Sequence, residues 1–183
     1  MNNSTKKLVL AALFVALGFV GANIKVMGSI AFDAVPAFLG TMILGVGWGA
    51  AIGAVGHLLT ALTSGFPYGL PAHIIIAVMM GVTMALFLVV INLLQRFKVP
   101  ELISYVAGAV AAVLVNGPGC IMLLFPVLEP VMGKEGLLAL IPVLSLVGAA
   151  KVALALVIYR VLPKAIRRQG KVYRDAHETT QNH

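Results

Sequence analysis

The sequence predicts an all-α integral membrane protein, a bundle of six transmembrane helices with both termini in the cytosol. Of its 183 residues, 61% are hydrophobic and only 10% are charged, whereas soluble domains carry about 25% charged residues. A soluble domain of this size has too little interior to hide so much apolar surface, so lipid must solvate it. Basic residues also gather at alternate ends of the apolar runs, as the positive-inside rule requires.

The first span is expected from Leu8 to about Asn23, after two lysines that keep its start in the cytosol. At sixteen residues it is short against the roughly 20 that a bilayer needs, so the following segment is expected at the outer interface. Ala12 and Ala16 are four residues apart and share one helix face. A cleaved signal peptide is the competing interpretation. A retained helix is favoured because the other spans also need partners for their small-residue faces.

The second and third spans return the chain to the cytosol and out again. Ile30 to Leu44 is opened by Asp33 and carries Pro36 in its first turn, where proline is tolerated. The third span, about Gly47 to Leu62, is expected to be central because small residues at four-residue spacing let helix backbones approach closely in lipid. These small residues are Gly45, Gly49 and Gly53, prolonged by Gly56.

Thr63 to Pro71 holds two prolines and two glycines and is predicted to be an outer loop. The fourth span, Leu70 to Gln95, ends at Arg96 and Lys98, which fits a cytosolic exit.

The fifth span, Leu102 to Val127, is interrupted by Asn116-Gly117-Pro118-Gly119, where we expect a kink beside a cavity. Glu129 to Gly136 is predicted to be an outer loop, and Leu137 to Val161 the sixth span. Residues 1–168 then form one membrane domain, and residues 169–183 a polar cytosolic tail.

The formal net charge of +7 does not indicate nucleic-acid binding. No basic face interleaved with aromatic residues occurs, and the charges instead flank the spans. In the six-span topology ten basic residues are cytosolic, Lys25 and Lys134 are outside, and Lys151 falls within a span. The ten are Lys6, Lys7, Arg96, Lys98, Arg160, Lys164, Arg167, Arg168, Lys171 and Arg174.

Lys151 is the first candidate for a functional residue. An ionisable side chain within a span costs about 2.5 to 3.5 kcal/mol on insertion scales, which favours a functional role. Lys151 either contacts a ligand or forms a structural ion pair with Asp33 or Glu129. Asn116 offers two donors and an acceptor where the helix is opened, either to a ligand or as a cap for the broken helix.

Four ring-bearing residues are candidates near the outer ends of the third and fourth spans. His57 and His73 either line a pocket or are ordinary polar residues whose hydrogen bonds are satisfied within the protein. Phe66 and Tyr68, stiffened by Pro67, either stack on a flat ligand or anchor the loop at the interface.

Enzyme, metal, redox and channel chemistry are not indicated. Ser64 lies in a Pro/Gly loop without a nucleophile-elbow pattern, and no phosphate-binding loop is present. Cys120 is the single cysteine, and the histidines show no metal-ligand spacing. A channel would show a ring of charges rather than one buried lysine. We therefore expect no catalytic residues, no metal and no cofactor.

Taken together, the short spans, the Ala12-Leu13-Phe14-Val15-Ala16 segment, the polar first loop and the glycine-rich third span resemble the substrate-binding S-component of an energy-coupling factor (ECF) transporter. The resemblance covers roughly Lys6 to Arg168. It implies a multi-pass protein of the cell membrane that binds a vitamin or vitamin precursor from outside. The partners it implies are a transmembrane coupling protein and two ATPases.

The resemblance also implies roles for single residues. Ala12 and Ala16 would dock on the coupling protein, and the segment from Asn23 to Asp33 would cover the outer pocket. The pocket candidates are Asp33, His57, Phe66, Tyr68, His73, Asn116 and Lys151, with His57 added from its place in the third span. The first loop has no tryptophan and the N-terminus is not histidine-rich, unlike some branches. The sequence is most similar to the vitamin-precursor group, including the alpha-ribazole branch, while pantothenate or a pyrimidine precursor remains an alternative ligand.

Overall fold

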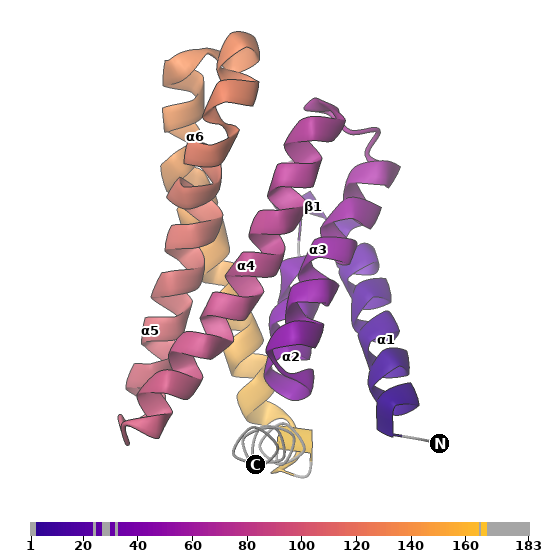
Figure 1. The fold of residues 1–183 in the computed structure, drawn as a ribbon, viewed down its shortest axis with the longest axis vertical. Coiled ribbons are helices and arrows are strands. Elements are labelled where there is room, and N and C mark those ends of the chain that lie inside the picture. Colours follow the sequence, from indigo (N-terminus) through magenta and orange to yellow (C-terminus); the bar gives the residue numbers. More distant parts are fainter. Residues whose placement is uncertain (1–2, 24, 27–29, 32, 165, 168–183) are drawn as a thin grey trace, which may run out of the picture.

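The protein is described by a computed structural model over residues 3–23, 25–26, 30–31, 33–164 and 166–167. It is a helical bundle in which most neighbouring segments run antiparallel (Figure 1). Four helical stretches are long and apolar enough to cross a membrane by length and composition: 4–23, 46–63, 69–96 and 101–161. The predicted helical membrane fold is confirmed at this level, and the count of six spans stays a prediction.

Helix α1 (Asn3–Asn23) begins before the predicted apolar run and includes both lysines. It is followed by a short antiparallel pair, β1 (Lys25–Val26) with β2 (Ile30–Ala31). The second predicted span was therefore wrong at its start, because Ile30 and Ala31 pair as a strand. Helix α2 (Ala34–Leu44) begins only after Asp33, with Pro36 in its first turn as predicted.

Helix α2 is too short to cross a bilayer alone. Its 11 residues span about 16 Å at 1.5 Å per residue, against roughly 30 Å of hydrocarbon. Nine of the 11 residues are buried, so α2 lies inside the bundle. Asp33 at its start is consequently held within the protein rather than at a free helix end.

Helix α3 (Val46–Thr63) packs between α2 and α4 (Gly69–Arg96), as its glycines predicted. A Cβ atom at Gly49 would collide with the side chain of Thr41 on α2. A Cβ at Gly53 would lie 3.1 Å from the carbonyl oxygen of Met80 on α4. Gly56 is different, since no described atom of a neighbouring element lies within 4 Å of the same position.

The stretch from α5 (Glu101–Leu114) through η1 (Val115–Gly119) to α6 (Cys120–Val161) is helical except at Gly133, where α6 divides into two helical arms. The predicted break at Asn116–Gly119 is present as the π-helical turn η1, which accommodates Pro118 without ending the helix. The prediction of an extended loop at Glu129–Gly136 was wrong in its extent, because the residues on both sides of Gly133 are helical, but the chain does turn back within this range. The non-helical residue is Gly133, with φ 71° and ψ 161°, a conformation that glycine adopts without strain.

The chain turns back at Gly133, and the two arms of α6 lie beside one another (Figure 1). Figure 1 also shows that α1 begins, α4 ends and α6 ends at one end of the bundle, while the α3–α4 turn lies towards the other. Two apolar clusters hold the elements together. The larger contains Phe38 and Phe87 in edge-to-face contact at 5.0 Å, and the smaller joins α4 to α6 through Met79 and Leu124.

Candidate functional site

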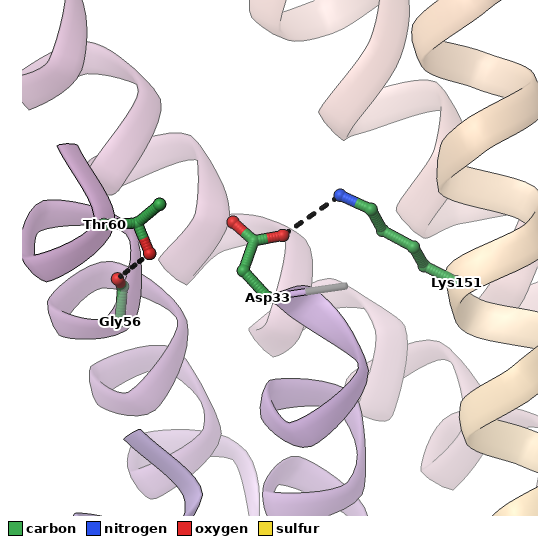
Figure 2. A network of polar contacts seen from close by, with 4 residues as sticks. All are labelled: Asp33, Gly56, Thr60 and Lys151. Carbon is green, nitrogen blue, oxygen red and sulfur yellow. Dashed lines mark hydrogen bonds and ion pairs between the residues drawn. The ribbon is translucent and has the colours of Figure 1, made fainter. Parts of the chain in front are cut away.

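An ion pair joins the start of α2 to the middle of the returning arm of α6. Lys151 Nζ donates a hydrogen bond to Asp33 Oδ1 at 3.1 Å, and the two side chains are 15% and 14% exposed. Figure 2 shows the two side chains reaching towards each other between the helices. Of the two interpretations of Lys151, the ion pair with Asp33 is thus present, and contact with a ligand stays a prediction.

Asp33 occupies the N-cap position of α2, where a carboxylate usually accepts a hydrogen bond from the backbone of its own helix. Here Asp33 makes no such capping bond, and its backbone is already helical at φ −59° and ψ −35°. The carboxylate is directed to Lys151 instead. The ion pair therefore takes precedence over local capping at this residue.

His57 and His73 form a pair across the hairpin of α3 and α4. His57 Nε2 lies 3.2 Å from His73 Nδ1, and the rings stack with centroids 5.3 Å apart. One of these two nitrogens must carry the shared proton, so each histidine determines the tautomer of the other. This contact gives each histidine a polar partner, and the prediction that the two residues line a ligand pocket stays a prediction.

The turn between α3 and α4 brings two aromatic rings onto His73. The Phe66 ring meets His73 edge-on at 5.6 Å, and the Tyr68 ring is stacked at 6.3 Å. Phe66 has a φ of 50°, which is unusual for a residue with a bulky side chain. Its amide donates to the carbonyl of Ala61 at 3.0 Å, which holds this strained turn in place.

We refer to His57, Phe66, Tyr68 and His73 as the ring cluster. Its most buried member, His73, is 5% exposed, and its Nε2 atom has no hydrogen-bond partner among the described residues. A buried polar atom without a partner is costly unless something outside the described chain satisfies it.

Asn116 lies against α6 rather than in the ring cluster. Its Nδ2 atom is 4.0 Å from the place where a Cβ at Gly148 would stand, one helical turn before Lys151. No side-chain hydrogen bond caps η1, so the capping interpretation of Asn116 has no support in the described bonds. Figure 2 also draws Thr60, whose hydroxyl donates to the Gly56 carbonyl of its own helix at 3.0 Å.

Ala12 and Ala16 are both exposed on α1. The neighbouring side chains of Leu13 and Leu17 are about half exposed, at 52% and 47%, so this face of α1 packs on no described element. Of the segment proposed to cover the pocket, Asn23 ends α1, and residues 24, 27–29 and 32 lie outside the described residues. The predicted tail at 169–183 also lies outside them.

The described residues contain no group of three or more His, Cys, Asp and Glu that could hold a metal ion. Cys120 is buried in the apolar cluster between α4 and α6. Sequence reasoning missed the pairing of the two histidines. His57 lies six residues before the Thr63–Pro71 break and His73 two residues after it, so these unequal distances did not indicate that the two rings would meet.

These features define a class: an apolar helical bundle of the membrane type that holds an ion pair between α2 and α6 and a cluster of ring-bearing side chains from α3, α4 and the turn between them. Residues 6–165 match the family described as ECF transporter, substrate-specific component, and the chain belongs to this family. Its members bind the transported substrate and are not enzymes. Searches of curated proteins and of solved structures gave no match.

Proposed function

We propose that the chain captures a vitamin or vitamin precursor at the outer side of the cell membrane, with alpha-ribazole as the specific candidate. Membership of the family makes the protein a substrate-binding transport subunit that works with ECF module partners. The particular ligand and the residues that bind it are proposals. The observation that supports them best is the ring cluster, in which the buried His73 Nε2 has no hydrogen-bond partner among the described residues.

The proposed ligand site has complementary parts. Phe66 and Tyr68 offer ring faces and edges to a flat heterocycle. His73 Nε2 offers an unused hydrogen-bonding atom, and Lys151 Nζ has donors beyond the one used on Asp33. Asn116 on η1 adds an amide beside Gly148, which is one turn along α6 from Lys151. A nucleoside-like molecule presents both the flat ring and the hydroxyl groups that such a set would bind.

The direction of capture follows from the charges. Basic residues lie at the start of α1, the end of α4 and the end of α6, which share one end of the bundle (Figure 1). The positive-inside rule assigns that end to the cytosol, so both termini are cytosolic in this proposal. The α3–α4 turn with Phe66 and Tyr68 then belongs to the outer side.

Ala12 and Ala16 are proposed to dock on the coupling protein. Small residues on an exposed apolar helix face let another membrane helix approach closely. Two ATPases would drive transport through that coupling protein.

The experiment is to purify the chain alone and identify co-purifying small molecules by mass spectrometry. The purified protein is then titrated with alpha-ribazole while Trp48 and tyrosine fluorescence is followed. One-to-one binding with the ligand recovered unchanged supports the proposal. Chemical turnover of the ligand, or an absence of saturable binding by any co-purifying compound, would contradict it.

A further inference from the structure

The positively charged group of the proposed site, the Lys151 ammonium, is already paired with Asp33. Lys151 and Asp33 are joined at 3.1 Å, and both side chains are largely buried. The Asp33 carboxylate makes no capping bond to α2, so Lys151 is the partner that the described structure gives it. The pair adds no net charge to the site.

A ligand carboxylate would have to compete with Asp33 for Lys151. If it displaced Asp33, that carboxylate would remain 14% exposed without its counter-charge, which is strongly unfavourable at such burial. If it did not, the ligand's own charge would be buried beside an anion. An uncharged ligand leaves the pair intact and can still accept a hydrogen bond from the remaining donors of Lys151.

The ring cluster indicates what such a ligand presents. His73 is 5% exposed with an unpartnered Nε2, and its ring already contacts those of Phe66 and Tyr68. Because Nδ1 is engaged with His57, the tautomer of the pair leaves Nε2 as either a donor or an acceptor. A flat heteroaromatic ring can stack in this cluster and present a ring nitrogen to that atom in either state.

We propose that Asp33 is a specificity-determining residue: by holding Lys151 it makes the site accept uncharged flat heteroaromatic molecules and reject carboxylates. This inference rests on the proposed function of the chain as a substrate-binding subunit. It separates nucleoside-like ligands from anionic, pantothenate-like ligands by charge. Asp33 acts through Lys151 and need not touch the ligand itself.

The test uses two probes that share a ring and differ by one negative charge, benzimidazole and benzimidazole-5-carboxylate. Both are titrated calorimetrically into the purified full chain. Wild-type protein is expected to bind benzimidazole at least about tenfold more tightly, equivalent to roughly 1.4 kcal/mol. The Asp33→Asn substitution removes the carboxylate that pairs with Lys151. The affinity of this variant for benzimidazole-5-carboxylate is expected to rise at least about tenfold.

A matched control separates this local effect from overall charge. Glu135→Gln removes one negative charge, as Asp33→Asn does, at an exposed position of α6. Glu135→Gln is expected to leave the preference for benzimidazole over benzimidazole-5-carboxylate unchanged. The double variant Asp33→Asn/Lys151→Met removes both charges and is expected to show no gain for the carboxylate, because the gain needs a free Lys151. If Asp33→Asn alone fails to fold, the preference of the wild-type protein between the two probes decides the matter.

Equal or tighter binding of the carboxylate by wild-type protein would overturn the inference, as would no millimolar binding of either probe. An unchanged preference in folded Asp33→Asn, or the same gain in Glu135→Gln, would also overturn it. Assembly with the coupling protein and ATPases is measured separately by co-purification. A chain that assembles but prefers the carboxylate refutes this inference alone, whereas one that binds benzimidazole but does not assemble refutes the proposed function.

Discussion

Lys151→Met tests whether the ion pair stabilises the fold. The substitution keeps an unbranched side chain of similar length but leaves Asp33 without its counter-charge at 14% exposure. Removing one partner of a buried ion pair costs about 3 to 5 kcal/mol. The residual exposure of both groups places this pair near the lower end, so we expect a loss of about 3 kcal/mol.

The expected loss of stability can be measured as a fall in the melting temperature. For chains of 150–250 residues, 1 kcal/mol corresponds to about 2 to 4 °C, so Lys151→Met should melt about 6 to 12 °C below the wild type. Scanning fluorimetry of the purified chain, with Trp48 and the tyrosines as probes, gives this number. The measurement is made without ligand, so binding does not contribute.

The double variant Asp33→Asn/Lys151→Met provides the control. It replaces both charges with uncharged groups of similar shape, which is often neutral or stabilising relative to a buried pair. We expect it to recover at least half of the lost melting temperature. A melting temperature of Lys151→Met within 2 °C of wild type, or a double variant no more stable than the single one, would refute the reasoning.

Four further predictions address other parts of the molecule. Gly49→Val should destabilise by about 1 to 3 kcal/mol in the same melting assay, because its side chain would overlap Thr41, whereas Gly56→Ala should be tolerated. Phe66→Asn, which still suits a φ of 50°, should weaken benzimidazole binding at least about tenfold in calorimetry without lowering the melting temperature. Lys151→Met should weaken alpha-ribazole binding at least about tenfold in the fluorescence titration. Ala16→Trp should abolish uptake and co-purification with the coupling protein while ligand affinity stays intact, and Val78→Trp, also on an exposed helix face, should change neither.

The helices could be predicted from the sequence because apolar runs, and basic residues at the ends of those runs, are local features of the chain. The apolar runs placed α1, α3 and α4 to within a few residues, and the glycine spacing correctly placed Gly49 and Gly53 in tight helix contacts. Local sequence could not show that Glu129–Gly136 is helical on both sides of the turn at Gly133. A single glycine with positive φ suffices to turn the chain back, so the charged residues around Gly133 did not need a loop.

The candidate site was harder to predict because its contacts join residues far apart in the chain. Asp33 and Lys151 are 118 residues apart, and sequence reasoning could name the pair only as one of two options. The histidines were placed correctly along their helices, but their pairing depends on how α3 and α4 rotate against each other. Packing of the small residues determines that rotation, and periodicity alone does not specify it.

The proposal that this chain captures a ligand for partner ATPases is tested most directly by uptake into proteoliposomes. Vesicles containing the chain with its coupling protein and ATPases are loaded with ATP on the cytosolic side, and the compound recovered from the purified chain is added outside in labelled form. We expect accumulation only when the chain, the partners and hydrolysable ATP are all present. Accumulation by the chain alone, or uptake by the partners without it, would contradict the proposed function.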